Sequence, residues 1–216
     1  MLVRERMTSN PVTITPETSV RDALQLMREK KIRRMPVLDS QGQLVGIISE
    51  KDLLYASPSS ATSLNVWEIH DLLYKLKVQK VMTTRVLTVG EDQPLEDAAR
   101  MMADAKIGGL PVMRGKTLVG IITESDLFKA FLQFLGGRRP GVRITAMIPN
   151  TKGTLAKITN AIFGVGGNIV GLAFSEDPNP GAAQWEMMVK VQDAPQAKLV
   201  EALKPVVREI MDVREV

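Results

Sequence analysis

The hydrophobic positions of this chain follow the same pattern twice, first in residues 7–53 and again in residues 82–127. In each copy four apolar residues occur at positions i, i+3, i+4 and i+7, which predicts an amphipathic helix. They are Val20, Ala23, Leu24 and Met27 in the first copy and Leu95, Ala98, Ala99 and Met102 in the second. Short apolar runs around this helix predict strands, and a second helix is expected after each run that ends in Gly-Ile-Ile. Each copy is therefore predicted to fold in the order β-α-β-β-α.

The two copies also share short stretches of sequence. Met7-Thr8 recurs as Met82-Thr83, and Gly46-Ile-Ile recurs as Gly120-Ile-Ile, with one residue deleted in the second copy after Met113. Self-similarity of this kind indicates a duplicated structural unit. Because a unit of about 50 residues buries too little apolar surface to be stable alone, we expect the two copies to pack together around shared strands.

The most specific shared motifs are the strands Arg34-Met-Pro-Val37 and Gly109-Leu-Pro-Val112 and the endings Gly46 to Leu53 and Gly120 to Leu127. On these motifs, residues 1–135 resemble a pair of CBS domains, which together are called a Bateman module. The resemblance implies a first CBS unit at residues 1–63, a connecting helix at 64–78 and a second CBS unit at 79–135. It also implies a homodimer with a mixed α/β (α+β) fold and a regulatory role. The ligand it implies is AMP, ADP, ATP or S-adenosylmethionine, with Mg²⁺ entering only on a nucleotide.

A bound nucleotide requires an apolar slot for the base, acceptors for the ribose hydroxyls and donors for the phosphates. Asp52 and Asp126 are the expected ribose acceptors, because a carboxylate can accept from both adjacent hydroxyls. Ser49 and Thr123 stand where a helix begins, a position that favours phosphate. The expected slot residues are Ile14, Met35, Pro36, Val89, Leu110 and Pro111, and the expected cationic donors are Arg33, Arg34 and Lys51. Since these cations occur in the first copy only, the first site is expected to favour more phosphate charge.

The same polar residues have a second interpretation. Ser49 with Asp52, and Thr123 with Asp126, have the spacing of a capping box, which satisfies backbone N–H groups at a helix start without any ligand. One residue can serve both roles, so the sequence leaves both open.

A different pattern follows the linker at residues 136–141. Residues 142–148 alternate as a strand, Leu155, Ile158 and Ile162 mark one face of a helix, and a strand opens at Asn168. After a turn cluster at 177–181, a third strand, a helix shortened by Pro205 and a last strand near the C-terminus complete the pattern. The predicted order from 142 to 216 is β-α-β-β-α-β, a ferredoxin-like unit.

The motif from Asn150 to Ile158, followed by Gly166-Gly-Asn168-Ile169, resembles an ACT domain, a regulatory fold that often binds an amino acid between two copies. The family usually has Asp where Asn150 stands and Pro where Lys152 stands, and both are altered here. The resemblance implies an amino-acid site at Asn150, Thr151, Gly153, Leu155, Asn168 and Ile169. The alternative is that the glycines and Asn168 only form turns. A CBS pair followed by an ACT domain resembles regulators of the acetoin utilisation protein B type.

Composition narrows the function further. The net charge of +4 suits an anionic ligand, and the absence of cysteine excludes thiol nucleophiles and disulfides and fits a reducing cytoplasm. No apolar run reaches the roughly 18 residues of a membrane span, and residues 1–6 do not form a secretory signal. His70 is the only histidine, so no nucleophile–base pair or metal site is proposed and no enzyme activity is expected.

The sequence therefore predicts a non-catalytic cytoplasmic sensor. A nucleic-acid-binding regulator is the alternative, because Lys30 to Arg34 and Arg138-Arg139 are basic runs, although no helix-turn-helix or aromatic platform accompanies them. The linker at 56–63 and the connecting helix at 64–78 separate the two copies. That helix is expected to cover the core or to face a partner.

Overall fold

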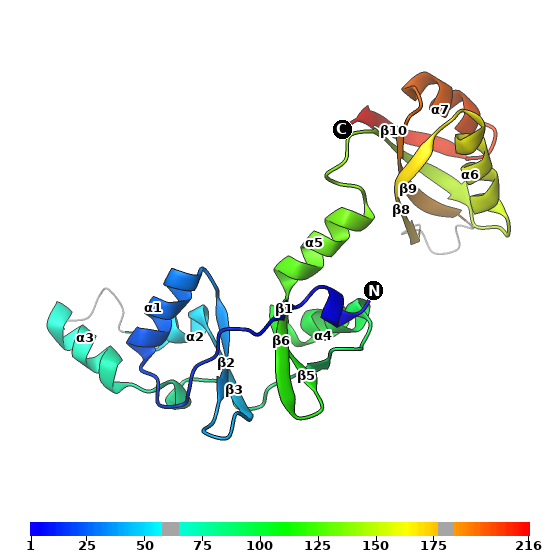
Figure 1. The fold of residues 1–216 in the computed structure, drawn as a ribbon. Coiled ribbons are helices and arrows are strands. Elements are labelled where there is room, and N and C mark those ends of the chain that lie inside the picture. The colour runs from blue at the N-terminus through cyan, green and yellow to red at the C-terminus, as the bar shows by residue number, and fades with distance from the viewer. Residues whose placement is uncertain (58–64, 177–183) are drawn as a thin grey trace. The chain divides into compact units, whose positions relative to one another are not determined.

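The computed structural model describes residues 1–57, 65–176 and 184–216, and of the side chains of α3 it leaves out residues 66 and 69–71 (Figure 1). The chain divides into two compact units, Met1–Leu127 and Phe128–Val216. Most of the linker expected at 56–63, the turn cluster at 177–181 and the side chain of His70 lie outside the described residues.

The N-terminal unit contains the duplicated fold that the sequence predicts. The first repeat consists of α1 (Val20–Lys30), β2 (Arg34–Leu38), β3 (Leu44–Ser49) and α2 (Glu50–Tyr55). The second consists of β4 (Val89–Gly90), α4 (Leu95–Ala105), β5 (Gly109–Arg114), β6 (Thr117–Thr123) and the start of α5 (Glu124–Phe134), a helix that continues into the C-terminal unit from Phe128. Between them lie α3 (Val66–Lys75) and the 3-10 turn η2 (Val78–Lys80); a similar turn, η1 (Val3–Glu5), precedes β1 (Thr8–Ser9).

The helix face predicted for α1 is confirmed, whereas in α6 (Thr154–Gly164) only Ile158 and Ile162 of the predicted face are buried and Leu155 is 43% exposed. Val20, Ala23, Leu24 and Met27 are all at most 8% exposed and pack into the core of the first repeat. The apolar run at residues 12–14, before the first amphipathic helix, also predicts a strand, but it forms only a single bridge, from Ile14 to Val37. Pro11 and Pro16 flank Ile14 and lack the backbone N–H groups that a longer ladder requires.

The repeats exchange their N-terminal arms. β1 precedes the first repeat but pairs with β6 of the second, with Thr8 opposite Ile121. In the corresponding place Thr83, ahead of the second repeat, forms a bridge to Ile47 of the first. The arms lie so close that a Cβ added at Gly46 or Gly120 would overlap the sulfur of Met82 or Met7, respectively. The two copies therefore share strands, as expected.

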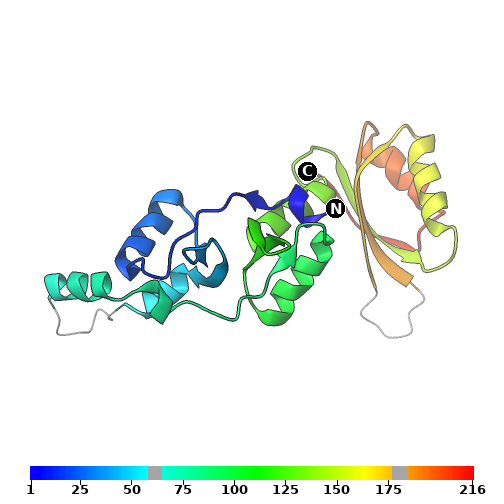
Figure 2. The same cartoon turned by 60° about the horizontal axis from the view of Figure 1, so that its bottom comes forward.

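The C-terminal unit has the predicted order β-α-β-β-α-β. It consists of β7 (Val142–Pro149), α6 (Thr154–Gly164), β8 (Asn168–Glu176), β9 (Gln184–Gln192), α7 (Gln196–Leu203) and β10 (Glu209–Glu215). Its antiparallel sheet has the order β10-β7-β9-β8. Both helices cover the same face of that sheet (Figure 2). As predicted, α7 ends before Pro205, which cannot continue a helix.

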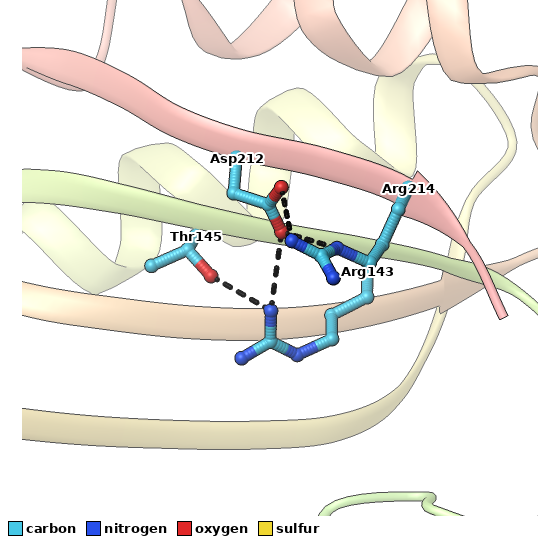
Figure 3. Close-up of polar contacts among 4 residues, drawn as sticks. All are labelled: Arg143, Thr145, Asp212 and Arg214. Carbon is cyan, nitrogen blue, oxygen red and sulfur yellow. Dashed lines mark hydrogen bonds and ion pairs between the residues drawn. The ribbon is translucent and has the colours of Figure 1, made fainter.

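The other face of this sheet carries a polar network around Asp212. Arg214 donates two hydrogen bonds of 2.7 Å to the carboxylate of Asp212, and Arg143 donates to Asp212 at 3.3 Å and to Thr145 at 3.1 Å (Figure 3). The hydrogen bonds from Arg214 are the main reason that the pKa of Asp212 is lowered. The carboxylate therefore stays ionised in the folded chain to lower pH than in the unfolded chain.

Leu135 and Gly136, which follow α5 and belong to the C-terminal unit, pack against β8 and β9. The buried Lys190 donates from Nζ to the carbonyl oxygen of Gly136 at 3.1 Å, close to the helix end, where a cation is favourable. A Cβ at Gly171 would lie 2.4 Å from the carbonyl carbon and oxygen of Leu135. The close approach of these two backbones therefore requires glycine at position 171. No helix in the described part of the chain is long and apolar enough to cross a membrane.

We expect Gly171→Ala to lower the free energy of unfolding by about 1–3 kcal/mol, the usual cost of overpacking, because backbone atoms cannot move aside as a flexible side chain can. Urea unfolding in a Trp67→Phe background, followed by the fluorescence of Trp185, measures this unit. Gly164→Ala is the matched control, since no atom lies within 4 Å of its added Cβ. Equal stability of the two variants would contradict the close approach.

Asp212→Asn is expected to weaken the loss of stability in acid. The stabilisation from a carboxylate with a lowered pKa is present above its unfolded value of about 3.9 and disappears as the pH falls through the folded value. Urea midpoints measured between pH 3 and 7 should therefore fall less steeply below about pH 4 for Asp212→Asn than for the unaltered chain. The exposed Asp104 provides the control, Asp104→Asn, which should leave the acid limb unchanged.

Candidate functional site

The N-terminal unit contains a cleft of about 450 Å³ to which both repeats contribute. This volume lies within the range of small-molecule sites. The first repeat contributes Arg33, Arg34, Ile47, Ser49, Glu50, Lys51 and Asp52, and the second contributes Thr83, Arg85, Val86, Leu87, Lys106, Ile107, Gly108 and Gly109.

The polar residues of the cleft lie at the ends of strands and helices. Arg33 and Arg34 stand at the start of β2, and Arg34 pairs in register with Ser49 at the end of β3. Asp52 lies in the first turn of α2. From the second repeat, Lys106 ends α4 in the left-handed conformation with φ 53°. Loop and end positions of this kind leave side chains and amides available to a ligand.

The capping-box interpretation is confirmed in the first repeat. Asp52 accepts hydrogen bonds at Oδ2 from the backbone N–H of Ser49 at 2.9 Å and from its hydroxyl at 2.6 Å. The Ser49 hydroxyl in turn accepts from the backbone N–H of Asp52 at 3.3 Å. All of these bonds to the carboxylate use Oδ2, and Oδ1 accepts none from the described residues. The cap therefore leaves one carboxylate oxygen for a ligand.

The second repeat forms the corresponding contacts. Asp126 accepts at Oδ2 from the backbone N–H of Thr123 at 3.0 Å and from its hydroxyl at 2.7 Å. Asp126 is only 9% exposed, and neither residue lines the cleft. Their part in a second nucleotide site stays a prediction.

The cleft is strongly basic. Its lining has five cationic side chains, Arg33, Arg34, Lys51, Arg85 and Lys106, against two acidic ones, Glu50 and Asp52. Three of the cations were expected from the sequence, whereas Arg85 and Lys106 were missed because they come from the other repeat. The repeat alignment gives no signal for Lys106, because its equivalent Lys31 does not line the cleft. An excess of positive charge in a concave site concentrates anions.

Arg34 has the most unusual environment of these cations. Burial lowers the pKa of its guanidinium, as does the neighbouring Arg33, while Glu124 and Asp52 act in the opposite direction. An arginine stays charged under such conditions. The cleft thus holds a partly desolvated positive charge close to two carboxylates.

The residues predicted to form the base slot lie elsewhere. Met35 and Leu110 are fully buried, Val89 is 1% exposed, and the two prolines Pro36 and Pro111 are also buried. Ile14 lines a separate groove beside α1. The apolar lining of the cleft comes instead from Ile47, Val86, Leu87 and Ile107.

The residues predicted to bind an amino acid lie at two places in the C-terminal unit. Asn150, Thr151, Gly153 and Leu155 lie at the start of α6, whereas Asn168 and Ile169 begin β8 at the opposite end of the sheet. Gly153 is the N-cap of α6 with φ 85°, and Thr151 shares a 2.9 Å hydrogen bond with Thr154. Asn150 and Asn168 are exposed, Leu155 is 43% exposed, and Ile169 packs against the core. Within the described residues no hydrogen bond links Asn168 to the turn, so ligand binding there stays a prediction. The described ranges also contain no group of three or more acidic or histidine side chains that could hold a metal ion.

The family model described as CBS domain matches residues 3–59 and again residues 78–133, which together are more than half of the chain. The chain belongs to the CBS-domain family. The matched ranges include the whole lining of the cleft, so the cleft is a feature of the CBS pair.

Three solved structures are similar to this CBS pair. A protein assigned as an acetoin utilization protein from Vibrio cholerae is 35% identical, with a TM-score of 0.52, over 61% of this chain and 90% of its own. CBSX2 in complex with AMP is 36% identical, with a TM-score of 0.51, over 61% and 96%. The CBS domain pair of protein MJ0100, in complex with 5′-methylthioadenosine and S-adenosylmethionine, is 28% identical, with a TM-score of 0.52, over 64% and 98%. The chain spans 58% of the full chloroplastic CBSX2 of Arabidopsis thaliana.

Removing the cap should cost stability even without a ligand. Ser49→Ala is expected to lower the free energy of unfolding by about 1 kcal/mol, the usual loss for an N-cap hydroxyl. Ser40→Ala, at an exposed serine of the β2–β3 turn, is the control and should change it by less than about 0.5 kcal/mol. Urea unfolding followed by circular dichroism measures both, and an unchanged Ser49→Ala variant would count against the cap.

Proposed function

We propose that the chain is a non-catalytic regulator that binds an adenosine-containing ligand in the cleft of its CBS pair. The observation that carries this proposal is the free Oδ1 of Asp52 beside five cationic side chains. The adenosyl ligands held by CBSX2 and by the MJ0100 pair support it. Binding changes the populations of the conformations of the pair, and a partner responds to that change.

Each part of the ligand has a complementary group in the cleft. The ribose hydroxyls donate to Asp52, which is fixed by its bonds from Ser49. The base packs on the apolar side chains Ile47, Val86, Leu87 and Ile107. Phosphate oxygens accept from the basic side chains, and Mg²⁺ enters only when the nucleotide brings it. In this proposal Thr123 and Asp126 provide a second adenosyl site.

For the C-terminal unit we propose an ACT-type regulatory role. The β-α-β-β-α-β order and the left-handed Gly153 at the start of α6 support an amino-acid ligand held between two copies, by Asn150 and Thr151 of one copy and Asn168 of the other. We also propose a cytoplasmic homodimer, as is common for paired CBS units.

We expect AMP, ADP, ATP, 5′-methylthioadenosine or S-adenosylmethionine to raise the thermal unfolding temperature. A ligand at 100 times its Kd adds about 2.7 kcal/mol to the stability of the folded state. Asp52→Asn keeps an acceptor for the cap but loses the charge, and it should weaken binding roughly 10- to 100-fold, the effect of one hydrogen bond to a charged group. Asp104→Asn removes a charge outside the cleft and should bind normally. No shift with any of these ligands would reject the proposal.

An amino-acid ligand should produce a separate shift that Asn168→Ala abolishes and Asp52→Asn leaves intact. Differential scanning fluorimetry with the common amino acids tests this. If no amino acid produces a shift, the turn at 150–153 and Asn168 are structural only, and the ACT proposal is rejected without affecting the nucleotide site.

A further inference from the structure

The sheet of the C-terminal unit has one face that its helices do not cover. α6 and α7 pack on the side where Ile144 and Val189 are buried (Figure 2). The residues between these buried positions point to the other side, because side chains alternate along a strand. Leu135 and Gly136 lie over that side at β8 and the adjacent end of β9. We call the remaining part, on β10, β7 and β9, the open face.

Three cationic side chains form a row across one end of the open face. The strand register places Arg214 of β10 opposite Arg143 of β7, and Arg143 opposite Lys190 of β9. Like charges directly opposite each other on neighbouring strands are destabilising. The carboxylate of Asp212, to which both arginines donate, offsets one of the three charges (Figure 3). This end of the face therefore keeps an excess of positive charge. Lys190 is buried, but the side chains of Arg143 and Arg214 are 38% and 61% exposed, within reach of a partner.

Two acidic side chains form a second row at the other end of the open face. Met147 of β7 lies opposite Glu209 of β10 on one side and opposite Glu186 of β9 on the other. Neither carboxylate forms a hydrogen bond or ion pair with a residue in the described ranges. The neighbouring Arg208 donates to Gln184 at 3.3 Å. At a rise of about 3.3 Å per residue, the two rows lie about 13 Å apart. The charge of the open face thus changes sign along its strands.

The row between them carries little net charge. It consists of Asp212, Thr145 and Met188, which lie opposite one another on β10, β7 and β9. Arg214 and Arg143 neutralise Asp212 through the bonds already described. Met188 offers a flexible apolar side chain that adapts to a facing surface. A surface with a basic end, a neutral middle and an acidic end is complementary to its own copy turned end for end.

We propose that the open face docks on the open face of a second copy of this chain, related by a two-fold axis along the middle row. This symmetry places Arg214 over Glu209 of the partner subunit and Glu209 over the partner's Arg214, so that each contact occurs twice. The basic row as a whole then faces the acidic row of the other copy. The opposite orientation, with the strands of both copies running the same way, would bring like charges together, which is costly. This pairing of the C-terminal units does not depend on the adenosyl ligand.

Chemical cross-linking of the full chain tests the proximity. Because the chain has no cysteine, an introduced cysteine reports contacts between copies. Met188→Cys puts a thiol on the middle row, where the two-fold axis brings it beside its counterpart. We expect bismaleimidoethane to link two copies into a dimer on a denaturing gel. Ala197→Cys, at an exposed position of α7 on the other side of the sheet, is the control and should stay unlinked.

Charge reversal tests the orientation. In Met188→Cys chains, Glu209→Arg should lower the yield of linked dimer at least about 10-fold, because it opposes two pairs of like charges. Arg214→Glu should do the same. An equimolar mixture of the two variants should restore the link, since each copy then supplies the charges that the other requires. Glu201→Arg makes the same charge change at an exposed residue of α7 and should leave the yield unchanged.

Loss of the link with Glu209→Arg and its recovery in the mixture support the proposal. It is rejected if Met188→Cys links no better than Ala197→Cys, or if Glu209→Arg leaves the link intact. If the introduced thiol at position 188 neither links nor reacts with N-ethylmaleimide, another part of the chain covers the face, and the proposal also fails. Circular dichroism checks that the variants fold, and if Arg214→Glu does not, Glu209→Arg alone decides the result.

Discussion

The close approach of each N-terminal arm to the Gly-Ile-Ile strand of the other repeat is the contact on which the N-terminal unit depends. β1 pairs with β6, and Thr83 forms a bridge to Ile47. The sulfur atoms of Met7 and Met82 lie where a Cβ of Gly120 or Gly46, respectively, would be. A repeat of this size has too little apolar surface to fold alone. Sharing strands lets the two repeats bury enough apolar surface together, and it also brings the first residues of β2 and β5 to one cleft.

Because the cleft is built from both repeats, it need not be symmetric. The two repeats have similar strands and helices. At equivalent positions that line the cleft, however, the first repeat has Arg33-Arg34 and the second has Gly108-Gly109. Lys51 likewise corresponds to Ser125. Two equal repeats would place like charges opposite each other, which is unfavourable at short distance. The difference in sequence places the arginine side chains in the first repeat and the small glycines in the second, and the two together form a single basic cleft.

The sequence predicts what depends on neighbours along the chain. The helix face of Val20, Ala23, Leu24 and Met27 follows from local spacing, and the cap of Ser49 and Asp52 follows from three residues of separation. Which residues line the cleft was harder to predict from the sequence. Met35 was expected to line the slot but is buried, because alternation in a short strand does not tell which face meets the core. Leu87 and Lys106 were missed because they join the site only through contact between repeats.

The cap of α2 explains why a carboxylate with a structural role can also serve as a binding group. Two hydrogen bonds from Ser49 fix Oδ2 of Asp52, so the orientation of the carboxylate is set before any ligand arrives. A ligand that donates to Oδ1 then loses little entropy in ordering this side chain. The positive end of the α2 dipole also helps to hold the charge at low cost. Under the proposed function the structural and binding roles of Asp52 are therefore compatible, because the cap orients the carboxylate that the ligand would meet.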